Sequence, residues 1–268
     1  MTPAWILTYF LLGGVVGLLA GLFGIGGGGV MVPVLTVMFA SQGFPDEHGL
    51  HLALGTSMAA IVPTAVSSLL AHHRRGAVLW PVVAQLAPGV VVGTFAATFL
   101  ASRLPTRPLA VFFVVFMTYV SWKMISSRPP KASRTLPPPV ALAGAGAGIG
   151  GVSALVAIGG GSLTVPFLAW CNVRLQTAIG TSAAVGLPIA FMGALGYVLN
   201  GLGVTGLPAG TLGYVYWPAA VGMALASSLT APLGARLAHR LPVLALKRMF
   251  AVLVLALALH MLYKVTTG

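Results

Sequence analysis

Long apolar segments alternate with short polar connections along the whole chain. A helix that spans a bilayer needs about 20 predominantly apolar residues, and several segments have that length. Two further apolar stretches are too long for a single helix, and a run of glycines interrupts the middle of each. The single-helix segments are 52–71, 78–100, 108–126, 177–198, 213–234 and 243–263, and the interrupted stretches are 5–40 and 140–171. This pattern predicts an all-α integral membrane protein.

The second half of the chain repeats the first. Residues 25–35 (IGGGGVMVPVL) align with residues 158–168 (IGGGSLTVPFL), and further matches follow in the same order. These matches pair 53–57 with 178–182, Pro63 with Pro188, 80–81 with 217–218, and 103–105 with 240–242. We therefore expect a first transmembrane repeat over 1–126, a linker over 127–139 and a second repeat over 140–268. Internal repeats of this kind are typical of transporter folds.

The composition indicates which solvent surrounds the chain. Hydrophobic residues make up 58% and charged residues only 6%, whereas a soluble domain carries about 25% charged residues. Such a chain cannot hide its apolar surface from water, so we expect a lipid bilayer around it. In a soluble protein the formal net charge of +12 would suggest a nucleic-acid partner. Here the basic residues lie between apolar segments, which fits membrane topology and gives no reason to expect nucleic acid.

The distribution of the basic residues favours inverted repeats. If each interrupted stretch crossed the membrane once, the fourteen Lys and Arg residues would divide seven and seven. If each stretch folds back, eleven lie on one side and only Arg103, Arg107 and Lys264 on the other, which is the bias expected of cytoplasmic loops. We therefore predict two inverted repeats, each a glycine-broken helical hairpin plus three transmembrane helices. Both termini and the loop with Asp46 and Glu47 then lie outside.

The glycine runs are the first candidate binding elements. Irregular backbone inside a bilayer occurs only where it is buried in protein or lines a wet cavity. The helix that follows each run begins with free N–H groups and the positive end of its dipole, which suit an anion. Close packing of helices through small residues is the alternative explanation. The candidate ligands are Gly26, Gly27, Gly28 and Gly29 in the first half, and Gly159, Gly160, Gly161 and Ser162 in the second.

Hydroxyl groups early in a crossing helix of each half form a second set of candidates. They are Thr56 and Ser57 in the first half and Thr181 and Ser182 in the second, and each pair precedes the proline matched by the repeat. Such hydroxyls can donate to an oxyanion, or they can bond back to their own helix. Gln85 adds a lone amide within a crossing segment, where a polar group usually faces protein or a cavity rather than lipid.

The scarcity of acidic residues argues against several other functions. The chain has two, Asp46 and Glu47, and both fall in one predicted loop. Because no crossing segment contains a carboxylate, we do not expect a proton relay or a cation site inside the membrane. No His or Cys cluster has the spacing of metal ligands, and Cys171 is the single cysteine, so we expect no metal and no cofactor. A site lined by N–H groups and hydroxyls favours an anion.

The paired glycine–proline pattern resembles a known family. The pattern G-I-G-G-G-x₄-P-x-L at 24–35, its counterpart at 158–168, and G-T-S in the next helix of each half resemble the TauE/SafE family of sulfite exporters, also called the sulfonate uptake permease family. The resemblance covers nearly the whole chain. It implies a multi-pass secondary carrier in the bacterial inner membrane for a small sulfur-containing anion such as sulfite, a sulfonate, sulfoacetate or thiosulfate. Where the first run has a fourth glycine, the second has Ser162, so a site that uses this serine is asymmetric.

The leading hypothesis is a transporter that binds its anion between the two repeats and alternates access by rocking one repeat against the other. A passive anion channel is an alternative that the sequence does not separate from a carrier. An intramembrane enzyme acting on a lipid phosphate is a third hypothesis, but such chemistry needs carboxylates or a metal. The sequence leaves open which sulfur anion is carried, the direction of flux, the coupling ion and whether the chain forms a homo-oligomer.

Overall fold

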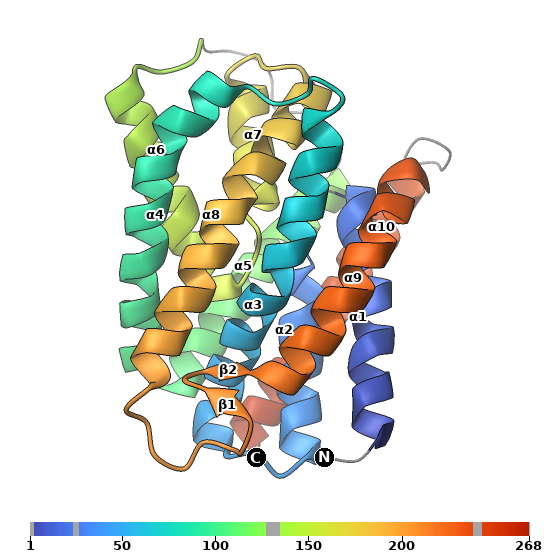
Figure 1. The fold of residues 1–268 in the computed structure, drawn as a ribbon, viewed down its shortest axis with the longest axis vertical. Coiled ribbons are helices and arrows are strands. Elements are labelled where there is room, and N and C mark those ends of the chain that lie inside the picture. Colours follow the sequence, from blue (N-terminus) through green and yellow to red (C-terminus); the bar gives the residue numbers. More distant parts are fainter. Residues whose placement is uncertain (1–2, 24–26, 127–134, 238–242, 268) are drawn as a thin grey trace.

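The computed structural model describes residues 3–23, 27–126, 135–237 and 243–267. The described part folds as a bundle of helices with one short antiparallel strand pair (Figure 1). The helices are α1 (Pro3–Phe23), α2 (Gly28–Ser41), α3 (Asp46–His73), α4 (Trp80–Arg103), α5 (Thr106–Ser126), α6 (Pro139–Val156), α7 (Gly161–Trp170), α8 (Leu175–Gly201), α9 (Trp217–Leu237) and α10 (Val243–Thr267). The strands are β1 (Thr211–Leu212) and β2 (Val215–Tyr216).

The predicted all-α membrane class is confirmed. Within the described residues, α1, α3, α4, α5, α6 and α8 are each long and apolar enough to cross a membrane. Each glycine run separates two helices, so the stretches 5–40 and 140–171 each form a pair. Large side chains such as Val92 and Val115 are two-thirds exposed, and a lipid environment explains so much apolar surface on a folded chain.

The predicted helix over 213–234 is wrong at its start. The chain instead forms the β1–β2 hairpin, in which Thr211 pairs with Tyr216, and α9 begins only at Trp217. Gly210 and Gly213 have φ angles of +89° and +56°, a backbone conformation that side chains other than glycine rarely adopt. These glycines turn the chain, and the apolar residues that follow Gly213 continue the hydrophobic run without continuing the helix.

The two helix pairs open toward opposite ends of the molecule. In Figure 1 both chain termini lie at one end, which we call the terminal end, and α1 and α2 have their open ends there. The other end, which we call the linker end, holds the start of α6, the end of α7 and the connection between α3 and α4. These directions are those that an inverted repeat produces, and we carry the inverted repeat forward as a proposal.

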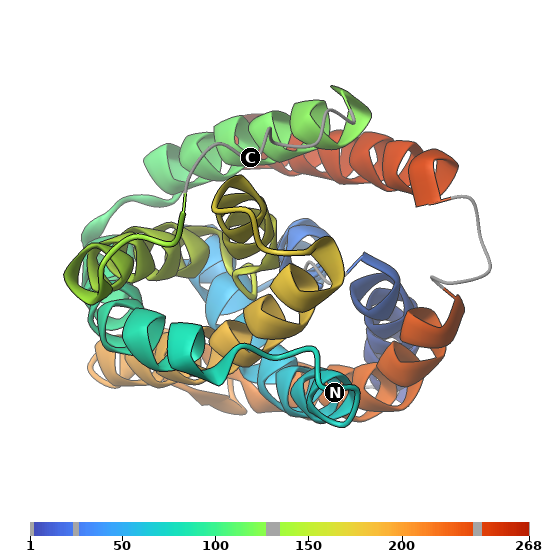
Figure 2. The same ribbon diagram turned by 90° about the horizontal axis from the view of Figure 1, so that it is seen from above.

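The packing interlocks the two halves of the chain. Helix α1 packs along α9 of the second half, and α6 packs along α4 of the first half. Helices α3 and α8 cross at the centre, and α5 and α10 lie side by side along one edge (Figure 2). Exchanging each helix for its repeat counterpart reproduces these main pairings. Neither sequence half therefore forms a separate bundle.

Exposed basic residues differ between the two ends. Arg74 and Arg75 follow α3 at the linker end, and Arg174 lies in the connection between α7 and α8 at the same end. The last turns of α5 and α9 add Lys123 and Arg236 to the linker end, whereas the terminal end has Arg103, Arg107 and Lys264. Because cytoplasmic loops carry the excess of Lys and Arg, the linker end is the end that we propose faces the cytoplasm.

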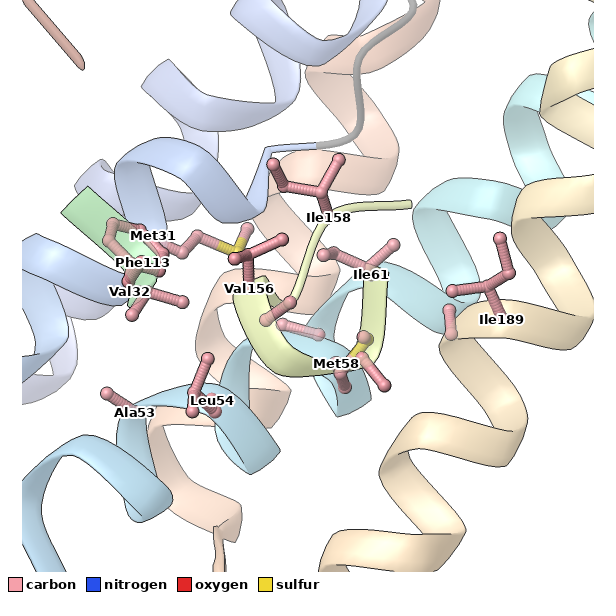
Figure 3. Packing of buried hydrophobic residues seen from close by; sticks show 14 of the residues in the cluster. Met31, Val32, Ala53, Leu54, Met58, Ile61, Phe113, Val156, Ile158 and Ile189 are labelled. Carbon is pink, nitrogen blue, oxygen red and sulfur yellow. The ribbon is translucent and has the colours of Figure 1, made fainter. Parts of the chain in front are cut away.

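Apolar side chains fill the centre, where the second helix pair reaches α2 and α3. Met58 and Ile61 of α3 lie beside Val156 at the end of α6 and Ile158 of the α6–α7 turn, with Met31 of α2 close by (Figure 3). All five are at most 3% exposed. This close packing holds the two turns in fixed positions relative to α3.

Candidate functional site

The tips of the two helix pairs touch in the middle of the molecule. Gly28, the first residue of α2, lies directly against the carbonyl group of Ala157, at the end of α6. A Cβ atom at Gly28 would overlap this carbonyl oxygen, so only glycine permits the approach. Both residues are buried. The two glycine-rich turns therefore form one central structure rather than two separate ones.

The second turn reverses the chain through residues in the left-handed backbone region. Ala157 has a φ of 48° and Gly160 a φ of +77°. The Ile158 N–H donates to the Ser153 carbonyl at 3.0 Å, which ends α6, and the Thr164 N–H donates to the Gly160 carbonyl at 2.8 Å, which begins α7. The glycine run thus supplies the conformational freedom that a tight reversal inside the bundle requires.

The glycines of the first turn are enclosed by protein. Gly27 lies against Val16, Gly28 against Ala157, and the position of a Cβ at Gly29 is 3.4 Å from the sulfur of Met117. All three glycines are buried and line neither of the cavities described below. Close packing thus accounts for these glycines, and anion binding by them stays a prediction. Gly26 lies outside the described residues.

The two repeated threonines make equivalent hydrogen bonds across the halves. The Tyr216 N–H donates to Thr56 Oγ1 at 2.9 Å, and the Leu79 N–H donates to Thr181 Oγ1 at 3.0 Å. Each donor directly precedes a Trp–Pro pair that begins a helix of the other half. Both threonines are fully buried. Their hydroxyls therefore fix where α4 and α9 begin, a structural role that the sequence reasoning did not anticipate.

The other predicted polar ligands have different surroundings. Ser182 Oγ donates to the Ile179 carbonyl of its own helix at 3.0 Å. The hydroxyls of Ser57 and Ser162 are buried and have no hydrogen-bond partner among the described residues. Gln85 is half-buried on α4 and lines neither cavity. Ser57 and Ser162 are thus the predicted ligands whose hydroxyls are still available.

Buried hydroxyls that the sequence analysis did not select also lack partners in the described part of the chain. They include Thr94 of α4, Ser153 of α6 and Thr164 of α7, all at most 1% exposed, and Ser228 of α9. Leaving a buried polar group unpaired costs about 1–3 kcal/mol. Such groups usually signal a bound water, an ion or a functional strain. The region around the turns therefore offers hydrogen-bonding groups to a bound species, although most of its packing is apolar.

A small cavity reaches this region from the linker end, and we call it the inner cavity. It has a volume of about 50 Å³ and lies between α1, α3, α8 and α9. Gly159 of the second turn and Gly186 of α8 line its deep part, and His72 lines it in the last turn of α3. A Cβ at Gly186 would lie 2.6 Å from the Gly159 carbonyl oxygen. The cavity thus connects the second glycine turn with one end of the molecule.

One face of α3 supplies the polar lining of the inner cavity. Thr64, Ser67, Ser68 and His72 all line it, and their spacing of three, four and eight residues from Thr64 places them on one side of a helix. No acidic residue belongs to the described lining. These residues were not predicted from the sequence, although hydroxyl groups that recur on one side of an apolar helix indicate a polar face.

Hydrogen bonds order part of this lining. The hydroxyl oxygens of Thr64 and Ser227 are 2.6 Å apart, and both residues are buried. Ser67 Oγ donates to the Thr64 carbonyl at 3.0 Å. The Ser68 hydroxyl has no hydrogen-bond partner among the described residues, and Ser68 lines the cavity. Ser68 can therefore donate a hydrogen bond to whatever occupies the space.

A larger cavity of about 550 Å³ lies at the terminal end, beside α2, α5 and α10. Asp46 and Glu47, the two acids of the chain, both line it, together with Arg107 and Lys264. An anion in this cavity would meet both carboxylates as well as the two basic side chains, whereas the described lining of the inner cavity contains no acidic residue. Metal chemistry has no support in either place: the described residues contain no group of three His, Cys, Asp or Glu side chains suited to a metal ion.

Comparisons with known proteins identify what this architecture is similar to. The family model described as sulfite exporter TauE/SafE matches residues 9–261. A probable membrane transporter protein of Haemophilus influenzae is 36% identical over 262 residues, which cover 97% of this chain and 99% of that protein. A probable membrane transporter protein of Methanocaldococcus jannaschii is 27% identical and covers 94% of this chain and 93% of its own. No solved structure matches the chain.

Proposed function

Because the chain belongs to the sulfite exporter TauE/SafE family of multi-pass membrane transporters, we propose that it is a secondary carrier for a small sulfur-containing anion. The observation that carries the proposal is the inner cavity, which leads from the linker end to the second glycine turn and has hydroxyl groups but no acid in its described lining. The names of the relatives specify a membrane transporter and no substrate.

The charge and polarity of the inner cavity support an anion over a cation. A cation inside a membrane protein usually meets a carboxylate or a set of carbonyl groups, whereas hydroxyl and N–H donors stabilise oxyanions. The exposed Arg74 and Arg75 follow His72 closely in the chain, so positive charge lies near the mouth of the cavity. Attraction of an anion toward this end follows from that charge, since the field of clustered charges raises the local concentration of counter-ions.

The repeat relates the inner cavity to a second, filled region at the terminal end. Because 53–57 aligns with 178–182, an offset of 125 residues, Ser68 corresponds to Gly193 and Ala183 to Met58. Ser68 and Ala183 both line the inner cavity. At the related place, the Met58 sulfur lies 3.0 Å from the position of a Cβ at Gly193. The side chain of Met58 thus occupies the space that Ala183 leaves free.

The side chain of Tyr197 also fills the region at the terminal end that the repeat relates to the inner cavity. It corresponds to His72 by the same offset, is fully buried, and donates its hydroxyl to the Ala154 carbonyl at 3.0 Å. A cavity that reaches one end while its related region at the other end is filled supports a carrier with alternating access. A conducting channel would need both paths open at once, so the one-sided cavity favours the carrier, and the counterflow experiment separates the two.

The interlocked packing of the two halves limits which movements could open the binding site to each side of the membrane in turn. Because α1 packs along α9 and α4 along α6, the two sequence halves cannot rock against each other as separate bodies. We propose instead that these two cross-half pairs move relative to the central α3 and α8. The lipid-phosphate enzyme considered from the sequence is not retained, since the family and its named relatives are membrane transporters.

A ligand panel tests the proposal directly. Purified protein in detergent would be heated with sulfite, sulfate, thiosulfate, sulfoacetate or taurine, with chloride and choline as controls. Binding to the folded state raises the apparent melting temperature, so at least one sulfur anion should raise it in a saturable manner. Equal melting temperatures with every sulfur anion and with chloride would contradict the proposed function.

A further inference from the structure

We propose that the inner cavity is a binding site for a compact sulfur oxyanion of a few heavy atoms, with the Ser68 hydroxyl as its principal side-chain donor and Ser67 and His72 beside it. This inference rests on the proposed transport function and names the site and the size class of the substrate. The site reaches the second glycine run at Gly159, but its principal donor lies on α3 and not at the start of α7. It places the bound anion on α3, in the half of the molecule toward the linker end.

The first observation that supports this site is the arrangement of hydrogen-bond donors on α3. Ser67 and Ser68 are adjacent on the cavity side of α3, and His72 lies one turn beyond Ser68. The Thr64 hydroxyl is held by Ser227 at 2.6 Å, which fixes the wall behind the serines. Ser68 is half-buried and lines the cavity, and its hydroxyl has no protein partner among the described residues, so it can turn toward an anion without breaking a hydrogen bond within the protein.

Small residues on the opposite walls leave room for this ligand. Ala20 and Gly21 of α1 and Ala183 of α8 line the cavity across from the α3 hydroxyls. None of these side chains can fill the space or form a hydrogen bond. The lining therefore has one polar wall with donors, and its other walls are formed by small apolar residues that leave the space free.

The repeat shows that the fold does not require these hydroxyls. The residues that correspond to Thr64, Ser67 and Ser68 are Ile189, Met192 and Gly193, none of which has a hydroxyl. The same helix position in the second half therefore folds and packs with apolar residues. A polar wall that only one repeat has is explained by a ligand that binds on that side.

The volume decides the size of the ligand. Sites for drug-sized ligands have volumes of about 300–1,000 Å³, whereas the inner cavity has about 50 Å³. A pyramidal or tetrahedral oxyanion such as sulfite or sulfate has four or five heavy atoms and no organic tail. The site therefore favours such an anion over an aminoalkyl sulfonate such as taurine.

Isothermal titration calorimetry on purified protein tests the site. We expect sulfite to bind the wild type, Ser68→Ala to raise its Kd about tenfold or more because a hydrogen bond to a charged group is lost, and Ser68→Thr to keep the wild-type Kd. Taurine should bind the wild type at least tenfold more weakly than sulfite. The matched control is Ser102→Ala on α4. It removes a hydroxyl that donates to the Phe99 carbonyl at 2.9 Å in an exposed position, and it should leave the Kd for sulfite unchanged.

The outcomes separate this inference from the proposed function. If the wild type binds sulfite and Ser68→Ala binds it equally well, the site is wrong and the transporter proposal stands. If no sulfur anion binds the wild type, both are overturned. Should Ser68→Ala fail to fold by size-exclusion chromatography, Ala183→Leu serves instead, since it adds a side chain across from Ser68 without removing a polar group. Unchanged sulfite binding in a folded Ala183→Leu variant overturns the site.

Discussion

Gly28 at the start of α2 lies against the carbonyl group of Ala157 at the end of α6, so the two helix pairs meet tip to tip inside the bundle. The contact is between backbones, and no side chain separates them. This single approach joins the first repeat to the second at the depth where the inner cavity ends at Gly159. Changes at the tips should therefore affect both stability and transport.

Gly28→Ala should destabilise the protein. A Cβ there overlaps the Ala157 carbonyl, and overpacking of a closed site costs about 1–3 kcal/mol. Gly148→Ala is the matched control, because nothing lies within 4 Å of a Cβ at this helical glycine, and alanine is the better helix former. Thermal unfolding in detergent should show a lower melting temperature for Gly28→Ala only. An unchanged melting temperature would mean that the tips do not touch as described.

Thr56→Val and Thr181→Val should each destabilise the fold by about 1–3 kcal/mol. Each change removes the acceptor of an N–H group, which is buried at Tyr216 and partly buried at Leu79, and an unpaired buried donor carries that cost. The expected result is a lower melting temperature for both, with the larger loss for Thr56→Val and with Thr→Ser at either position close to wild type.

Thr118→Val is the control for these two variants. Its hydroxyl bonds to the Val114 carbonyl of its own helix at 2.8 Å, and the residue is exposed, so the melting temperature should hardly change. If Thr118→Val proves as destabilising as Thr56→Val, the cross-half hydrogen bonds have no special importance.

Cysteine labelling should distinguish the open and filled regions. In a Cys171→Ser background, a cysteine at Ala183 faces the inner cavity and should react with a small thiol reagent. A cysteine at Met58, the repeat counterpart, replaces a fully buried side chain and should react at least tenfold more slowly. Equal reaction rates in the absence of substrate would contradict the one-sided cavity.

Membrane topology can be read from the two exposed arginine positions. Arg75→Cys at the linker end should be labelled by an impermeant thiol reagent only in inside-out vesicles, and Arg107→Cys at the terminal end only in intact cells. This follows from the excess of basic residues that cytoplasmic loops carry. Labelling of both positions from the same side would contradict a membrane-spanning α4. The inverted repeat places Arg174→Cys on the same side as Arg75→Cys, and labelling of Arg174→Cys from the side of Arg107→Cys would rule it out.

The sequence predicted the helical architecture well because glycine runs and apolar lengths are local signals. It predicted the break within 5–40, and α1 and α2 lie on either side of it. It missed the β1–β2 hairpin, because Tyr214, Val215 and Tyr216 extend an apolar run and nothing in hydropathy distinguishes a buried strand from a helix. The positive φ angles of Gly210 and Gly213 turn the chain into a hairpin, and hydropathy carries no information about backbone angles.

The candidate site was predicted less well for a reason that lies in the repeat itself. Matching the two halves selected Thr56 and Thr181, which the repeat keeps because both halves need the same hydrogen bond to position a helix start. The same matching passed over Ser67 and Ser68, since their counterparts are Met192 and Gly193. Symmetry in the sequence thus indicated the scaffold, and the departure from symmetry indicates the proposed site.

Counterflow in liposomes tests the central claim most directly. Purified protein would be reconstituted into vesicles loaded with unlabelled sulfite, and entry of ³⁵S-sulfite would be followed under anaerobic conditions. A carrier that exposes its site to one side at a time predicts transient, saturable accumulation of label above equilibrium, which disappears when the internal sulfite is omitted. Uptake that rises linearly with concentration and is indifferent to internal sulfite would contradict the carrier, and uptake equal to that of empty liposomes for every sulfur anion would contradict the proposed function altogether.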